Sequence, residues 1–99
     1  VLNNYAYYLS LRGEKLEKAK KMSEKTIELF PKEANYLDTY AWILYKLKDY
    51  ASAKTFMLQA IELGESKTFY NHMSDILIEL GEVEEAEKYK LKAKELEDE

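Results

Sequence analysis

Few residues of this chain have types and spacings that could support chemistry, and the clearest set surrounds its single histidine. His72 is followed by Asp75 at i+3 and by Glu79 at i+7, so the three side chains would share roughly one face of a helix. Imidazole and carboxylate groups can bind Zn²⁺, but a closed site needs a fourth ligand from another element, and the sequence offers none. An ordinary polar helix surface is therefore the favoured interpretation, and we predict no metal or other cofactor.

Other catalytic arrangements are also missing from the sequence. It contains no cysteine, which excludes thiol chemistry and disulfides and leaves the cellular compartment open. Neither a Gly-rich phosphate loop nor the strand-to-helix turn that presents a nucleophilic serine can be found. We predict that the chain is not an enzyme, and we assign no catalytic residue.

A second group of residues suits binding. Asn35, Asp38, Trp42 and Tyr45 recur at i, i+3, i+7 and i+10, beside the apolar stripe of their helix and not on it. Tryptophan and tyrosine combine a large apolar body with a polar tip, and both are enriched at binding hot spots. The alternative is that Trp42 and Tyr45 pack between neighbouring helices, and for Tyr45 the two interpretations are evenly balanced.

The elements that must position these residues are short amphipathic helices. Between Asn35 and Leu63, apolar residues recur at i, i+3, i+4 and i+7 in two runs that are broken at Lys48-Asp49. Neither run is long enough to be stable alone in water, so each must bury its stripe against the other. The joint between them is so short that it allows only an antiparallel helical hairpin.

The same hairpin recurs before and after this segment. Counting back 34 residues from Ala53 gives Ala19, and counting forward 33 gives Ala86. In the first helix of the hairpin, Ala41 corresponds to Ser74 by the same forward shift. We therefore predict a single domain, residues 1–99, built from three repeats at about residues 1–33, 34–66 and 67–99.

Turn and cap signals divide the three repeats into six helices. Gly13 is expected to take the left-handed conformation that ends a helix, and Pro31 stops the next one. Asp49 and Ser66 are candidate N-caps. Glycines end the fourth and fifth helices, at Gly64 and Gly81. The expected helices span about 1–12, 14–30, 32–47, 50–63, 66–80 and 82 onward.

Small residues at the expected helix crossings, with a large apolar residue before them in the first helices, resemble the tetratricopeptide repeat. Its period is about 34 residues. The small residues are Ala6, Ala41 and Ser74 in first helices and Ala19, Ala53 and Ala86 in second helices, and the large residues are Tyr5, Tyr40 and Met73. Glu65, where Pro31 predicts proline, and Thr26, in place of alanine, depart from the pattern. The resemblance implies an all-α, right-handed superhelical solenoid of three helical hairpins, with six antiparallel helices.

In a tetratricopeptide solenoid, the first helices line a concave groove where extended peptides or partner helices dock. The resemblance implies protein–protein interaction as the function. The alternatives are a structural segment that caps a longer array and an accessory domain of a catalytic parent. The implied groove residues are Asn3, Tyr7, Ser10, Asn35, Asp38, Trp42, Tyr45, Thr68, Asn71, Asp75 and Ile78.

Charge narrows the choice of partner. Asp38 and Asp75 would repel a C-terminal carboxylate, which argues against the repeats that clamp chaperone tails and favours a neutral or basic peptide. The net charge of −4 is concentrated in residues 82–99, and no basic surface is evident, which argues against nucleic acid. No apolar run approaches the ~18–20 residues of a membrane span.

The two ends of the chain carry different signals. It begins inside a helical repeat and without methionine, so we expect an excised piece of a longer protein. In its last helix, Lys90 and Lys94 stand where Met57 and Ile61 stand one repeat earlier. Because a terminal repeat needs a polar outer face, we expect this helix to cap the array and the isolated chain to be monomeric.

The amino-acid sequences of the predicted first helices show a narrower resemblance. Three segments, in chain order, are similar to the last three repeats of long bacterial tetratricopeptide proteins: LNNYAYYLS, YLDTYAWILYK and HMSDILIELGE. Many such proteins are exported or lipid-anchored in the envelope. The resemblance implies a bacterial origin and favours a periplasmic or cell-envelope location over a cytoplasmic one.

Overall fold

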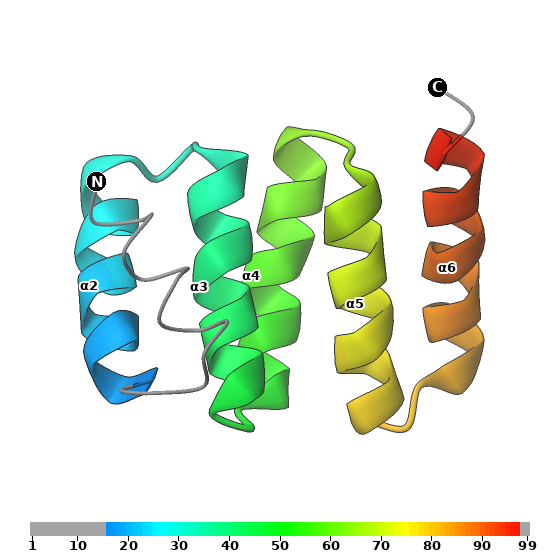
Figure 1. Ribbon diagram of the computed structural model, residues 1–99, viewed down its shortest axis with the longest axis horizontal. Helices are drawn as coiled ribbons and strands as arrows, with labels where there is room; N and C mark the ends of the chain where they lie inside the picture. The colour runs from blue at the N-terminus through cyan, green and yellow to red at the C-terminus, as the bar shows by residue number, and fades with distance from the viewer. Residues whose placement is uncertain (1–15, 98–99) are drawn as a thin grey trace.

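The computed structural model describes residues 16–97, and every regular element in that range is an α-helix. Figure 1 shows the helices arranged side by side in chain order from α2 to α6. The first predicted helix lies outside the described residues, and so do Asn3, Tyr7 and Ser10. None of the helices between residues 16 and 97 combines the length and apolar character that crossing a membrane requires. The helices are α2 (Leu16–Leu29), α3 (Ala34–Lys46), α4 (Tyr50–Leu63), α5 (Lys67–Glu79) and α6 (Val83–Glu97).

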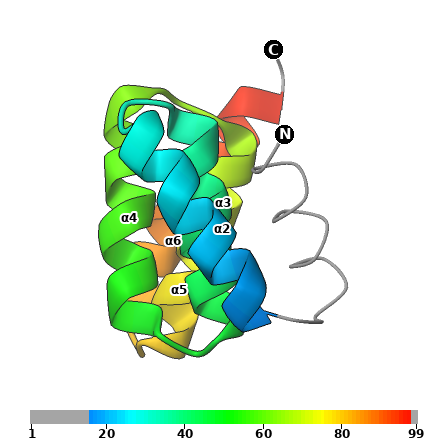
Figure 2. The ribbon, with the colours of Figure 1, turned by 90° about the vertical axis from the view of Figure 1, so that its left-hand side faces the viewer.

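Consecutive helices pack against one another as the hairpin pattern predicts, and α3 also touches α5. Viewed along the row in Figure 2, α2 lies in front of α3, and α4 lies to the left of both. Most of the interior is one cluster of buried side chains drawn from α3, α4, α5 and α6. The short buried side chains at the crossings let neighbouring backbones approach closely. The crossing residues Ala19, Ala41, Ala53 and Ser74 are fully buried, and Ala86 is nearly so.

The registers of the repeats are confirmed by burial. Leu37, Tyr40, Ala41 and Leu44, the predicted stripe of α3, are all buried. The forward shift of 33 residues carries this stripe onto buried residues of α5, and the backward shift of 34 carries Ala53 onto buried Ala19. Among the described residues, the spacing of apolar residues was therefore sufficient to place the buried stripes of α3 and α5.

The turns inside the two complete hairpins have the same geometry. After α3, the Lys48 N–H donates to the Tyr45 carbonyl at 3.0 Å and the Asp49 N–H to the Leu44 carbonyl at 2.9 Å. After α5, Gly81 and Glu82 make the equivalent bonds to Ile78 and Leu77, at 3.0 and 2.9 Å. This pair of bonds is the Schellman motif, which needs a left-handed residue after the helix. Lys48 and Gly81 supply it, with φ of 69° and 81°.

The other predicted caps are partly confirmed. The Asp49 carboxylate accepts a bond from the Ser52 N–H at 3.4 Å and caps α4. Ser66 occupies the N-cap position of α5, as predicted, although its hydroxyl makes no capping bond. The Ser66 carbonyl instead accepts the first backbone bond of the helix, from the Tyr70 N–H at 3.1 Å. Gly64 ends α4 in an extended conformation, with φ of −179°, so no left-handed residue is needed there.

Candidate functional site

Two helices of neighbouring repeats position the candidate binding residues. On α3, Asp38, Trp42 and Tyr45 are spaced at i, i+4 and i+7, so their side chains leave the helix on one face. Because α3 and α5 are in contact, these side chains meet residues of the following repeat. The residues of α5 that join them are His72, Asp75 and Glu79.

Trp42 is the centre of this site. Its ring lies parallel to the Tyr45 ring, with centroids 4.5 Å apart and an interplanar angle of 10°. It also lies nearly parallel to the imidazole of His72, with centroids 3.9 Å apart and an angle of 17°. Two rings so close to the indole centre would overlap each other on one face, so they cover opposite faces. The three stacked rings, Tyr45, Trp42 and His72, form an aromatic ladder that joins α3 to α5.

A buried carboxylate fixes the end of the aromatic ladder. The Nδ1 atom of His72 lies 2.8 Å from Oδ1 of Asp38. A carboxylate can only accept, so the imidazole N–H donates this bond and the orientation of the ring is set. The Asp38 side chain is only 9% exposed and that of His72 16%. Asp38 therefore fixes the position of the aromatic ladder, and its charge is not exposed at the surface.

The other end of the aromatic ladder lies in a negative environment. Burial raises the pKa of the Tyr45 phenol, and the carboxylates of Asp75 and Glu79 raise it further. Tyr45 therefore stays neutral at physiological pH and remains a hydrogen-bond donor. On the same helix, the ammonium group of Lys46 lies 5.5 Å from the centre of the Trp42 ring, within the range of a cation–π contact.

The structure brings together only some of the residues that the sequence assigned to the groove. Trp42 and Tyr45 are half-buried, as is Asp75 close to them. Asp38 is buried under the aromatic ladder instead of facing a ligand. Asn71 is half-buried and lines a depression between α5 and α6. The remaining predicted residues of the described chain are exposed, namely Asn35, Thr68 and Ile78.

Sequence reasoning missed two members of the site. His72 was interpreted as part of a polar helix surface, although its imidazole pairs with Asp38 and stacks on Trp42. Glu79 was not assigned to the groove, although its charge acts on Tyr45. Between residues 16 and 97, no group of three or more potential metal ligands comes together, and the His72 imidazole is turned towards α3.

Comparison with protein families agrees with this architecture. The model of the tetratricopeptide repeat matches residues 34–65 and 68–99, which are more than half of the chain. The chain belongs to the tetratricopeptide repeat family. The matched segments coincide with the hairpins α3–α4 and α5–α6. A search among curated proteins found no match. Tetratricopeptide repeats are generally protein–protein interaction modules, so the family makes a protein the expected class of partner. The bacterial and envelope association stays a prediction.

Proposed function

We propose that this tetratricopeptide domain binds a peptide or helix of a partner protein in the concave groove of a right-handed superhelix. The observation that carries the proposal is the aromatic ladder, a stack of three rings built across two repeats and left partly open to solvent. Such a stack at the surface of the protein is not required to form its folded interior. An interaction site gains from one, because rigid aromatic groups contribute contact area at a low cost in conformational entropy.

The geometry of the aromatic ladder favours a particular ligand chemistry. Both faces of the Trp42 indole are covered, so a ligand would meet the edges of the stacked rings and not a free aromatic face. Asp75 and Glu79 add negative charge beside Tyr45. The partner we propose is therefore a neutral or basic peptide with an apolar or aromatic anchor. The net charge of −4 makes nucleic acid an unsuitable ligand.

The proposal can be tested by the fluorescence of Trp42, the only tryptophan of the chain. Basic, neutral and acidic peptides that share one central aromatic residue would be titrated into the protein. We expect the basic peptides to change the emission and to bind most tightly. Trp42→Ala removes this signal, so its binding would be measured with a labelled peptide. We expect the substitution to weaken binding by ~2 kcal/mol or more, as for a hot-spot residue.

Two controls define this test. Leu63→Ala changes an exposed apolar residue at the end of α4, outside the predicted groove residues, so it should leave binding unchanged. Asp75→Asn should weaken the basic peptides mainly by slowing their association, because surface charges steer encounter. If the acidic peptides bound best, or if Trp42→Ala bound as tightly as the parent chain, the proposed site would be wrong.

A structural role at the end of an array is the second candidate. It is supported by the exposed Lys90 and Lys94 of α6, which replace buried Met57 and half-buried Ile61 of α4. In this role the last hairpin would close the hydrophobic interior, and the charged surface would keep the chain monomeric. Lys90→Met with Lys94→Ile should then increase self-association, which light scattering would detect.

A further inference from the structure

The outer surface of α6 contains a depression of about 460 Å³ that no described element fills. This helix stands at the end of the row in Figure 1, opposite α2. The surface carries Leu91, whose side chain is 60% exposed, beside Ala93, which is only 3% exposed. We call this surface the end face. Its lining residues are Asn71, Glu87, Lys90, Leu91, Ala93 and Lys94.

The end face is a copy of a surface that already binds a helix inside this chain. Subtracting the repeat shift of 33 from each lining residue gives Asp38, Lys54, Met57, Leu58, Ala60 and Ile61. In the middle repeat these residues receive α5. Met57 and Ala60 are fully buried in one cluster with Met73 of that helix. Asp38 bonds to His72 of α5. The end face therefore has the outline of a docking surface for one more helix.

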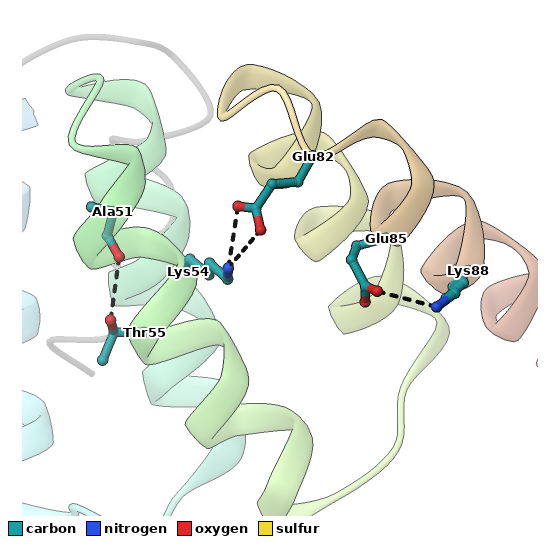
Figure 3. A network of polar contacts seen from close by, with 6 residues as sticks. All are labelled: Ala51, Lys54, Thr55, Glu82, Glu85 and Lys88. Atoms are coloured by element: carbon teal, nitrogen blue, oxygen red, sulfur yellow. Dashed lines mark hydrogen bonds and ion pairs between the residues drawn. The ribbon is translucent and has the colours of Figure 1, made fainter.

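A polar contact at the rim of the middle repeat shows how the helix is held there. The Lys54 ammonium group donates to both carboxylate oxygens of Glu82, at 3.0 and 3.2 Å, just beyond the end of α5 (Figure 3). At the end face, Glu87 takes the place of Lys54. A helix that docked in the same way would therefore need a basic residue where this chain has Glu82.

Two substitutions at the centre of the end face change the kind of helix that fits. Lys90 and Lys94 replace Met57 and Ile61, and neither lysine has a partner among the described residues. Burying two ammonium groups under an apolar helix is strongly unfavourable, because neither charge would have a partner there. A helix that carries carboxylates opposite the lysines avoids this cost, since each charge then has a partner. Leu91 and Ala93 remain available for apolar contact between the charged pairs.

We infer that the end face binds an amphipathic helix of a partner protein that carries carboxylates opposite Lys90 and Lys94 and a basic residue opposite Glu87. The inference does not depend on the aromatic ladder, because the two surfaces involve different residues and opposite ligand charges. A charged docking surface also favours reversible association over permanent stacking of a further apolar repeat. Without the partner, the same lysines oppose the approach of a second copy of the chain.

A peptide derived from the chain itself provides the probe. It has the sequence of residues 66–82 with Glu82→Lys, which supplies the basic residue opposite Glu87, and with Phe69→Glu and Met73→Glu, since these two buried side chains belong to the cluster that contains Met57. The peptide with Glu82→Lys alone serves as the apolar comparison. Fluorescence anisotropy of a labelled peptide would measure binding to the 99-residue chain. We expect the acidic peptide to bind more tightly than the apolar comparison, and its affinity to fall as salt is added.

Charge reversal on the protein locates the binding. Lys90→Glu with Lys94→Glu should weaken the acidic peptide about tenfold or more, because two attractive contacts become repulsive. The matched control is Lys21→Glu with Lys25→Glu, two exposed lysines with the same spacing on α2, at the other end of the row. The control changes the net charge by the same amount and should leave binding almost unchanged. All four lysines are exposed, so circular dichroism should show equal thermal stability for both variants.

Three outcomes would overturn the inference. The acidic peptide could fail to bind the parent chain. Both double variants could weaken binding equally, which would indicate net charge alone. Trp42→Ala could abolish binding while the reversal at Lys90 and Lys94 had no effect, which would place the peptide on the aromatic ladder. A peptide with lysine in place of both introduced glutamates should prefer the reversed variant, and this exchange of preference would support the inference most directly.

Discussion

The hairpins α3–α4 and α5–α6 follow one another at a constant shift of 33 residues, yet they present different surfaces. Their interiors agree closely. Leu44 and Leu77 are both buried, and so are the alanines Ala60 and Ala93. The difference lies where each hairpin faces the next repeat. Trp42 and Tyr45 of the first hairpin become Asp75 and Ile78 of the second, and buried Met57 and half-buried Ile61 become exposed Lys90 and Lys94.

This comparison separates what folds the chain from what distinguishes one repeat from the next. A small set of interior positions at helical spacing is sufficient to build each hairpin, because burial of these stripes offsets the weak stability of the isolated helices. The positions that face the next repeat are then free to vary. One pair of these positions carries Trp42 and Tyr45 of the aromatic ladder, and another carries the lysines of the end face.

The largest expected effect comes from shortening the equivalent buried leucine in each hairpin. Leu44→Ala and Leu77→Ala should each lower the free energy of unfolding by ~2–5 kcal/mol, because each leaves a cavity at a position that is 1% exposed in the native chain. Urea denaturation followed by circular dichroism would measure both losses. A loss below ~1 kcal/mol in one hairpin only would mean that the two interiors are not equivalent.

How much of this could be read from the sequence depends on which contacts are involved. Contacts within a hairpin follow from helical spacing and a short turn, so the buried stripes and the Asp49 cap were predicted correctly. The hydrogen bond between Asp38 and His72 joins two repeats. The two residues are 34 positions apart, one more than the shift of 33 between the hairpins, so the repeat spacing alone does not pair them. Spacing inside one helix does not reveal the angle at which the next repeat meets it.

The same limit applies to the predicted groove residues of α5. On α5 the predicted stripe included Asn71 and Ile78, whereas His72 joins the aromatic ladder and the charge of Glu79 acts on Tyr45. The difference of one position corresponds to a rotation of about 100° around the helix. Asp75 belongs to both sets, because its charge also acts on Tyr45. Packing between repeats decides this rotation, and the sequence of a single helix does not contain it.

A smaller difference between the interiors concerns pH. Tyr40 corresponds to Met73, and its phenol donates a bond to the Glu24 carboxylate at 3.2 Å. Burial, and then the charge of Glu24, raise the pKa of Tyr40 to about 12. Unfolded tyrosine has a pKa near 10, so the stabilisation is complete below about pH 10 and is lost as the pH rises towards 12. The loss should be of the order of 2 kcal/mol in the free energy of unfolding.

The matched variant for this pH effect is Tyr40→Met, which gives the first hairpin the residue of the second. Urea denaturation between pH 9 and 12 would compare it with the parent chain. The parent should lose stability more steeply than the variant over this range, and its last tyrosine to ionise, seen by absorbance, should be missing from the variant. Parallel curves for the two proteins would contradict the assignment of the raised pKa to Tyr40.

The smallest expected effect concerns the turns, where the backbone is the same and the residues differ. Lys48 and Gly81 both have positive φ, which costs a residue with a Cβ about 1–2 kcal/mol. Part of this cost is offset because glycine loses more backbone entropy on folding. Lys48→Gly should therefore stabilise the protein by about 0.5–1 kcal/mol, and Gly81→Lys should destabilise it by a similar amount.

Gly81 gives a clean measurement of this backbone term. A Cβ placed on it would meet no atom within 4 Å, so the substitution adds strain without a steric clash. The double variant, Lys48→Gly with Gly81→Lys, exchanges the residues of the two turns and should return the free energy of unfolding to within ~0.5 kcal/mol of the parent value. If Lys48→Gly were destabilising, the lysine side chain would have to contribute more to the first turn than its left-handed backbone costs. The two hairpins would then differ in their turns as well as in their surfaces.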